Sequence, residues 1–279
     1  MILSTAKTSG EAASSGTAEI IGRIREALEA AVRILEPYAA GGVAVEYKSP
    51  RDPVTAADYA VDDALHQLLP LPGEGWLSEE SADDLTRLSR DRVWVVDPLD
   101  GTREFVAGLP EWCVSIACVE HSRAVAGGIV NPATGETFLG AIEAGLLYND
   151  KPARASDRGC LSGALVLASR SEVKRGDWER FTDAAFSIQP TGSVAYKLAR
   201  VAAGLADATW TLAPKHEWDV AAGVALVEAA GGFVQSLSGS QIVFNNEHPV
   251  LSGLIAGGES LRPQLVSLLK PYLTTHTRR

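Results

Sequence analysis

Two aspartates stand three residues apart at the end of an apolar run, in the segment WVVDPLDGTREF at residues 94–105. The run itself, residues 93–96, predicts a buried β-strand. Pro98 fixes its own φ and has no backbone donor, so the strand is expected to give way to a turn between the two acids. Asp97 and Asp100 then face the same space, where two carboxylates 4 Å apart repel by roughly 4 kcal/mol at an effective dielectric constant of about 20. Without a compensating positive charge, one of them would take up a proton.

A divalent cation would remove this conflict. Carboxylate and carbonyl oxygens, here those of Asp97, Asp100 and the backbone of Leu99, suit a hard ion such as Mg²⁺. Gly101 and Thr102 could then open a helix whose free N–H groups face an anion. The alternative is that Asp97 is a turn residue and Asp100 a helix cap, with no ion between them.

Other acidic residues also stand where predicted elements begin or end. Glu79 and its neighbour Glu80 follow an apolar run, whereas Asp58 and Asp219 lie at the starts of predicted helices. Taken singly, Asp58 and Asp219 are typical N-terminal helix caps. Taken together with the two aspartates above, they predict one converged acidic site.

The composition is that of a soluble globular protein. The chain has 279 residues, 46% of them hydrophobic and 22% charged, which allows one large domain or two small ones. The formal net charge of −10 argues against nucleic acid or an anionic membrane as a partner, although a bound metal would still admit an anionic small substrate. No run reaches the roughly 18 apolar residues of a membrane span. We therefore expect a cytoplasmic enzyme, monomeric or homodimeric, with a small-molecule substrate.

The cysteines are odd in number and lie in apolar runs. This pattern predicts that Cys113, Cys118 and Cys160 are reduced core thiols and neither a disulfide nor a metal site.

The first half of the chain reads as helices on an antiparallel sheet. Apolar residues recur at helical spacing from Ile21 to Tyr38, and a second helix, with Val61, Leu65 and Leu68 on its apolar face, is expected from near Thr55. Short β-like runs follow the strand at 93–96, with a turn at 131–135 between two of them. These runs cover residues 113–119, 124–130, 137–141 and 145–148.

The second half alternates strands and helices, which is typical of an α/β unit. The expected elements are a strand at 164–168, a helix near 177–186, a helix after Gly192 and Ser193, a strand at 207–211 and a helix from about 219 to 230. We accordingly predict a flexible leader at 1–17, an N-terminal α+β domain at 18–153 carrying most of the metal ligands, and a C-terminal α/β domain at 154–279.

Four segments, in this order and spacing, resemble the inositol-monophosphatase superfamily of Mg²⁺-dependent, lithium-sensitive phosphomonoesterases. They are DPVTAAD, WLSEES, WVVDPLDGTREF and EWDVAAGVALVEAAGG, and the likeness extends from about residue 20 to 258. The resemblance implies a layered αβαβα sandwich of the sugar-phosphatase type and two or three Mg²⁺ ions. The metal ligands that it implies are Glu79, Asp97, the Leu99 carbonyl, Asp100 and Asp219, with Asp58 as an outer or third-metal ligand.

Such a site predicts hydrolysis by water that a metal activates. Thr102, with Glu79 or Asp58 as its partner, is expected to orient and deprotonate the water, while the N–H groups of Gly101 and Thr102 hold phosphate oxygens. No covalent intermediate is needed. Haloacid-dehalogenase phosphatases use a nucleophilic aspartate in D-x-D-G-T, but here the spacing is D-x-x-D-G-T, one residue longer.

The substrate is less well marked. The segments TREF, LSEES and SRSE resemble the 3'(2'),5'-bisphosphate nucleotidase branch, and Leu212 stands where inositol phosphatases carry a sugar-binding glutamate. Against this branch, Glu172 stands where a histidine is common. Candidates to bind phosphate or the rest of the substrate are Gly192, Ser193, Lys197, Arg170 and Lys215, although the three basic residues would also be ordinary solvated charges.

Several functions therefore stay open. The first expectation is hydrolysis of 3'-phosphoadenosine 5'-phosphate to AMP and phosphate. The alternatives are an inositol-1-monophosphatase or related sugar phosphatase, including a fructose-1,6-bisphosphatase, and a catalytically silent binding protein on the same fold.

Overall fold

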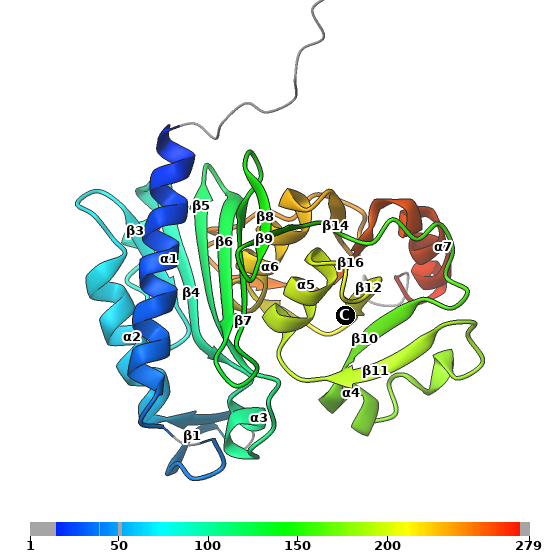
Figure 1. The fold of residues 1–279 in the computed structure, drawn as a ribbon, viewed down its shortest axis with the longest axis horizontal. Coiled ribbons are helices and arrows are strands. Elements are labelled where there is room, and N and C mark those ends of the chain that lie inside the picture. The colour runs from blue at the N-terminus through cyan, green and yellow to red at the C-terminus, as the bar shows by residue number, and fades with distance from the viewer. Residues whose placement is uncertain (1–14, 39, 50–51, 274–279) are drawn as a thin grey trace, which may run out of the picture.

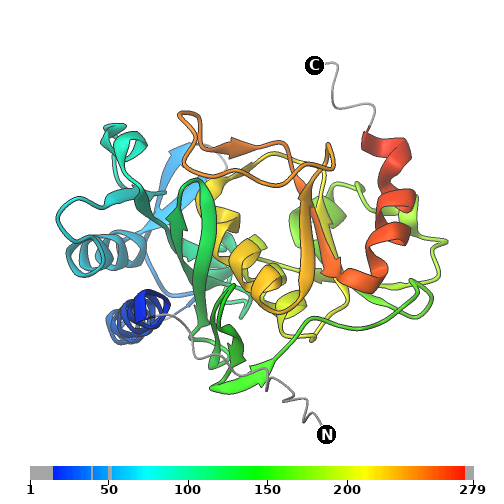
Figure 2. The same ribbon diagram turned by 90° about the horizontal axis from the view of Figure 1, so that it is seen from above.

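The computed structural model describes residues 15–38, 40–49 and 52–273, which fold into five layers (Figures 1 and 2). The outer layer on one flank consists of two helices, α1 (Ser15–Leu35) and α2 (Ala56–Leu68). Buried residues of α1 such as Ile20, Ile24 and Leu28 recur at steps of four, so one face of the helix packs on the sheet behind it.

The second layer is a seven-stranded sheet in the order β3-β4-β5-β6-β7-β8-β9. Its first pair, β3 and β4, is parallel, and all the others are antiparallel neighbours along the chain. The strands are β3 (Gly75–Ser78), β4 (Arg92–Asp100), β5 (Cys113–Glu120), β6 (Arg123–Asn131), β7 (Glu136–Ala141), β8 (Gly145–Tyr148) and β9 (Lys151–Ala153).

The central layer holds α5 (Val194–Ala202) and α6 (Glu217–Ala229), which contact both sheets. α6 is apolar nearly all round, as expected of a helix covered on every side. The close approach to the first sheet requires a glycine, because a Cβ on Gly127 would lie 2.6 Å from the carbonyl oxygen of Ala222. This packing brings the start of α6 to the sheet edge where the acidic residues lie.

A five-stranded mixed sheet and α7 (Arg262–Leu273) complete the sandwich on the opposite flank. The outer face of this sheet buries stacked Trp178 and Trp210 together with Phe181. The strands, in sheet order, are β11 (Ser187–Thr191), β10 (Leu165–Ser169), β12 (Ala208–Thr211), β16 (Leu254–Gly258) and β14 (Gly232–Ser236).

Shorter elements complete the fold. They are the hairpin of β1 (Val45–Ser49) and β2 (Asp52–Thr55), α3 (Thr102–Val106), α4 (Arg170–Lys174), the pair of β13 (Lys215–His216) and β15 (Val250–Leu251), and the 3-10 turns Thr86–Ser89, Glu179–Phe181 and Glu259–Leu261.

The layered αβαβα sandwich is therefore confirmed, and so are most of the predicted elements. The strand expected at 93–96 continues to Asp100, with an irregular register between Asp97 and Asp100. The helix expected near 177–186 is wrong: Trp178 and Phe181 are buried by a single 3-10 turn after Gly176, whose φ is +82°. Much of the predicted leader, residues 1–14, lies outside the described residues, whereas residues 15–17 begin α1.

Two side-chain predictions also need correction. Leu68 is 43% exposed, and the neighbouring Leu69 is buried in its place. Cys113 and Cys118 are buried and unpaired as expected, but Cys160 is exposed because it lies in the long connection between the two sheets. The segment around it, residues 158–163, has one apolar neighbour, Leu161, so the prediction of a core position there is wrong.

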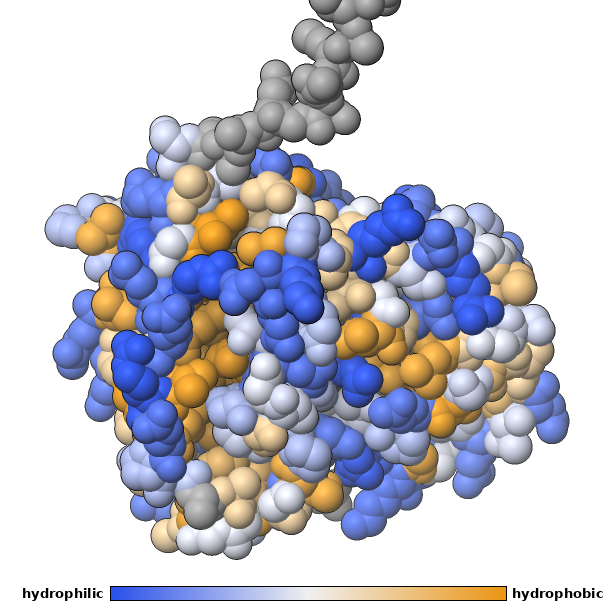
Figure 3. Space-filling model, viewed as in Figure 1, coloured by the Kyte–Doolittle hydropathy of each residue, from blue (hydrophilic) through white to orange (hydrophobic). Residues whose placement is uncertain are grey.

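The surface is mixed in character. Figure 3 shows hydrophilic residues over most of one face, with apolar side chains gathered in the groove beside α1, where Leu28, Val32 and Leu139 line a shallow hollow. Among the described residues, every helix is too short or too polar to span a lipid bilayer.

Candidate active site

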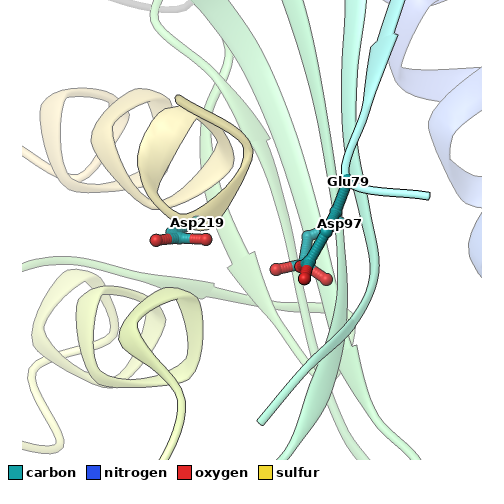
Figure 4. Close-up of side chains that lie close together, drawn as sticks. All are labelled: Glu79, Asp97 and Asp219. Carbon is teal, nitrogen blue, oxygen red and sulfur yellow. The ribbon is translucent and has the colours of Figure 1, made fainter. Parts of the chain in front are cut away.

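Three carboxylates from separate elements meet at one edge of the seven-stranded sheet. Glu79 directly follows β3, Asp97 lies in β4, and Asp219 lies in the first turn of α6. Because β3 and β4 run parallel with Ser78 opposite Val96, Glu79 and Asp97 lie side by side. One carboxylate oxygen of each of the three residues lies within 4.8 Å of the other two, and Figure 4 shows all three groups facing the same space.

The electrostatics of this acid cluster (Glu79, Asp97 and Asp219) indicate missing positive charge. Burial, followed by the neighbouring carboxylates, raises the pKa of Asp97 well above its usual range. Burial also raises the pKa of Glu79 to about 7, and burial and the charge of Asp100 raise that of Asp219 to about 8. Three hard oxygen donors in mutual repulsion fit a divalent cation such as Mg²⁺.

Asp100 lies beside the acid cluster but makes different contacts. Its Oδ2 atom accepts hydrogen bonds from the Ser193 hydroxyl and from the backbone N–H of Ala195, both at 2.6 Å. Ser193 is the N-terminal cap of α5 and holds a positive φ of 55°. Asp100 thus joins the first sheet to the start of α5, and one of its two oxygens is already engaged.

The segment between the two aspartates is a closely bonded turn. The Leu99 N–H donates to Asp97 Oδ1 at 3.0 Å, and the Leu99 carbonyl accepts from the Thr102 hydroxyl at 3.0 Å. Gly101 has a φ of +99°, and a Cβ there would lie 2.9 Å from the Glu111 carbonyl oxygen, so only glycine fits. The sequence D-P-L-D-G-T therefore specifies this turn locally.

Thr102 and Asp58 form a pair beside the turn. The Thr102 hydroxyl lies 3.2 Å from Asp58 Oδ1, while Asp58 Oδ2 accepts from the backbone N–H and the hydroxyl of Thr55 at 2.8 and 2.7 Å. Asp58 is thus part of the capping box of α2, as its position in the sequence indicated. Burial raises its pKa, although the bonds from Thr55 and Thr102 oppose the shift.

Lys48 supplies a positive charge whose ion pairs the sequence did not indicate, although the segment that carries it, residues 40–52, was expected to lie over the site. Its Nζ lies 2.7 Å from Glu79 Oε1 and 2.9 Å from Glu80 Oε1. Burial works against its ionised form, but the two glutamates outweigh burial and raise its pKa. Because Lys48 lies in β1, a strand with a mostly exposed surface, neither periodicity nor a motif marked it as part of the site.

Lys197 is buried, so of the two interpretations open from the sequence, a substrate-binding residue and a solvated surface charge, the second is wrong. The residue is 3% exposed, and its Nζ donates to the carbonyl oxygens of Ser193 and Thr191 at 2.8 and 3.4 Å. Burial lowers its pKa to about 8 despite the nearby Asp100. It is a partly desolvated cation at the start of α5.

Arg170 is bound in an ion pair. Its guanidinium binds the carboxylate of Glu111, with Nε 3.0 Å from Oε2, and the same Oε2 accepts from the Gly192 N–H at 3.0 Å. A Cβ on Gly192 would collide with the side chain of Glu104. Glu104 and Glu111 therefore shape this wall, and no spacing in the sequence had pointed to them.

These residues surround one cavity of about 230 Å³. All the predicted site residues line it except Asp58, which lies behind Thr102. The lining residues are Pro53, Glu79, Asp97, Leu99, Asp100, Gly101, Thr102, Arg103, Glu104, Ser169, Arg170, Ser171, Gly192, Ser193, Val194, Lys197, Lys215 and Asp219.

The likeness to a known family extends over nearly the whole sequence. A model of the inositol monophosphatase family matches residues 18–272, which is nearly the whole chain. The chain belongs to the inositol monophosphatase family. Members of this family are phosphatases, and the αβαβα fold agrees with the resemblance seen in its motifs.

Individual relatives within the family carry different names. An inositol-1-monophosphatase of Mesorhizobium japonicum is 34% identical over 239 residues, which is 82% of this chain and 87% of that protein. The solved structure of the extragenic suppressor protein suhB from Bartonella henselae has a TM-score of 0.78 at 32% identity, covering 90% of this chain and 98% of that one. The structure of CysQ from Bacteroides thetaiotaomicron has a TM-score of 0.69 at 27% identity, covering 88% and 97%.

Leu212 and Glu172, the two residues that bear on which branch of the family the chain resembles, do not line the cavity. Leu212, where the resemblance to inositol phosphatases implies a sugar-binding glutamate, lines a separate pocket with Trp178 and Trp210. Glu172 is buried and accepts from the Thr211 hydroxyl at 2.6 Å and from the Trp178 indole N–H at 3.1 Å. Neither side chain is among those that line the cavity.

Proposed function

We propose that this family member is a Mg²⁺-dependent phosphomonoesterase. The observation that carries the proposal is the acid cluster, in which Glu79, Asp97 and Asp219 place oxygens within 4.8 Å of one another with raised pKa values. We assign the second oxygen of Asp100 and the Leu99 carbonyl to the same set of ligands, for two or three ions, with Asp58 as an outer ligand. When bound, Mg²⁺ would lower the pKa of water and offset the charge of the phosphate.

Residues of the chain would position and deprotonate the attacking water. The Thr102 hydroxyl, held between Asp58 and the Leu99 carbonyl, is placed to accept a hydrogen bond from water and to pass a proton to Asp58. Glu79 is the alternative partner because its carboxylate also lines the cavity. The N–H groups of Gly101 and Thr102 would hold phosphate oxygens, and no covalent phosphoenzyme is required.

We propose that the substrate is 3'-phosphoadenosine 5'-phosphate, which the enzyme would hydrolyse to AMP and phosphate. This substrate carries two phosphates and so more negative charge than a monophosphate, and the cations Lys197, Lys215 and Arg103 line the cavity that would receive it. The apolar Leu212 in place of a sugar-binding acid supports the same choice.

The second candidate is an inositol-1-monophosphatase or another sugar phosphatase, including a fructose-1,6-bisphosphatase. It is supported by the 34% identity to the Mesorhizobium enzyme, whose name gives that activity. With an inositol monophosphate there is no second phosphate to bind, and Lys197 would contact only the reacting phosphate.

A panel of substrates with and without Mg²⁺ tests the proposal. We expect phosphate release from 3'-phosphoadenosine 5'-phosphate to exceed that from inositol 1-phosphate and fructose 1,6-bisphosphate, to need Mg²⁺, and to be inhibited by millimolar Li⁺. Preference for inositol 1-phosphate would establish the second candidate. No release from any small phosphomonoester would indicate a silent binding protein on this fold.

A further inference from the structure

A second, larger hollow adjoins the active-site cavity. Its volume is about 710 Å³, and it shares three lining residues, Pro53, Arg103 and Ser171, with the cavity that holds the acid cluster. The hollow lies between the β1–β2 hairpin, α3 and α4, which run along one edge of the molecule at the bottom of Figure 1. A ligand held at the acid cluster therefore has open space on this side.

The hollow has the opposite charge to the cavity beside it. Arg103, Lys174 and Arg175 line it, and none of its described lining residues is acidic, in a chain whose net charge is −10. Arg175 forms an ion pair with Asp177 at 2.8 Å, but both side chains are more than 40% exposed, so the pair is weak. Within the described part of the chain, Lys174 has no ion-pair partner.

Helical geometry explains why Ser171 and Lys174, two residues of α4, both line the hollow. Ser171 and Lys174 are three residues apart in α4, so they share a face of that short helix, and both line the hollow. Ser171 also lines the cavity of the acid cluster. Lys174 thus lies on the path that leads outward from the reacting centre.

The opposite wall is aromatic and apolar. Tyr47 in β1 is 64% exposed, and Pro53 in β2 separates the two spaces. An exposed aromatic ring beside cations can stack on the flat body of a ligand while the cations bind its anionic end. This combination matches a nucleotide better than a polyol, which has neither a flat ring nor, in a monophosphate, a second anion.

We propose that this hollow is a distal subsite for the second phosphate of a phosphomonoester with an aromatic body, a nucleoside bisphosphate. The inference rests on the proposed phosphatase function, because the scissile phosphate would lie at the acid cluster. Lys174 and Arg175 bind the second phosphate, and Tyr47 contacts the base. The site therefore selects substrates by an anion remote from the bond that breaks.

The test compares two ligands that differ only in the second phosphate. Calorimetric titration measures the affinity of adenosine 3',5'-bisphosphate and of adenosine 3'-phosphate for wild-type protein, Lys174→Gln, Arg175→Gln and the double variant, all with Mg²⁺ and Li⁺ present to suppress turnover. We expect wild type to bind the bisphosphate more tightly than adenosine 3'-phosphate. The ratio of the two dissociation constants should fall roughly tenfold in the double variant. Lys270→Gln, an exposed change in α7, is the matched control and should keep the preference.

The outcomes separate this inference from the proposed function. Equal affinity for the two nucleotides in wild type, or an unchanged preference in the double variant, overturns the subsite even if the enzyme cleaves both. If no nucleotide is cleaved but the preference is present and falls in the double variant, the subsite stands and the proposed reaction fails. A smaller salt dependence of bisphosphate binding in the double variant would support the same assignment.

Discussion

The ammonium group of Lys48 lies 2.7 Å from the Oε1 atom of Glu79, one of the three carboxylates of the acid cluster. A cation and Lys48 would therefore compete for the same carboxylate. Lys48 also lies 2.9 Å from Glu80, so the β1–β2 hairpin is tied to the end of β3 by two ion pairs. The charge of Lys48 offsets part of the repulsion within the acid cluster.

Replacing Lys48 should expose this competition. We expect Lys48→Met to bind Mg²⁺ about two- to fivefold more tightly, because one competitor for Glu79 is removed. Without Mg²⁺ the variant should unfold at a lower temperature than wild type, because Glu79 and Glu80 lose their counter-charge. Calorimetric titration and thermal unfolding measure the two effects, with Lys151→Met as an exposed control in β9. Weaker Mg²⁺ binding in Lys48→Met would show that Lys48 assists the ion.

The pKa values of Glu79, about 7, and Asp219, about 8, predict how stability depends on pH. In the unfolded chain these groups titrate near pH 4, so between about pH 5 and 8 the folded state binds more protons than the unfolded state. The free energy of unfolding of Mg²⁺-free protein should therefore fall as pH rises through this interval. The stabilisation gained on adding Mg²⁺ should grow over the same interval, since the ion binds ionised carboxylates.

Urea unfolding at pH 5, 6.5 and 8, with chelator or with Mg²⁺, measures both trends. A metal-free stability that rises steadily from pH 5 to 8 would mean that the acid cluster is not a site of uncompensated charge.

The buried ammonium group of Lys197 should lower the free energy of unfolding, while it places a positive charge where an anionic substrate would bind. Burial lowers the pKa of Lys197 in the folded state to about 8, below that of a free lysine. At pH 7 the side chain is therefore still charged although it is desolvated. We expect Lys197→Met to be more stable than wild type by about 1–2 kcal/mol at pH 7. Between about pH 8 and 10, Lys197 carries its proton in the unfolded state but not in the folded state, so the wild-type free energy of unfolding should rise with pH. The stability difference between Lys197→Met and wild type should therefore shrink.

Urea unfolding at pH 7 and 10 checks this difference, and the KM for the best substrate of the panel should rise in the same variant. A variant that is less stable than wild type at both pH values would show that the bonds from Lys197 to Ser193 and Thr191 matter more than desolvation.

The central turn of the site could be predicted from the sequence because its geometry is local, whereas the full set of metal ligands was implied by the resemblance of four segments to a known family. The turn at Asp97–Thr102 is fixed by Pro98, by Gly101 at a φ of +99° and by hydrogen bonds within the segment itself. Asp58 and Asp219 stand three residues after their caps, Thr55 and His216, which places each carboxylate in the first turn of a helix. Short-range patterns of this kind need no knowledge of tertiary structure.

The other residues of the site are brought together by contacts between segments that lie far apart in the chain. Lys48 reaches Glu79 across 31 positions, and Arg170 reaches Glu111 across 59, so no local spacing marks either pair. The segment 177–186, where a helix is expected from the alternation of strands and helices, also depends on tertiary contacts. The burial of Trp178 and Phe181 against Trp210 is provided instead by one 3-10 turn.

The central claim is that Glu79, Asp97 and Asp219 together hold Mg²⁺, and titration of Mg²⁺ into wild type and Asp97→Asn tests it most directly. Asp97 is 1% exposed and belongs to the acid cluster, whereas Asp91, exposed before β4, provides the control Asp91→Asn. We predict saturable binding in wild type and in Asp91→Asn, and binding weakened at least about a hundredfold in Asp97→Asn. Without metal, the folded state of Asp97→Asn should be at least as stable as wild type, because the variant removes one of the mutually repelling acids. Binding of equal affinity in all three proteins would contradict the central claim.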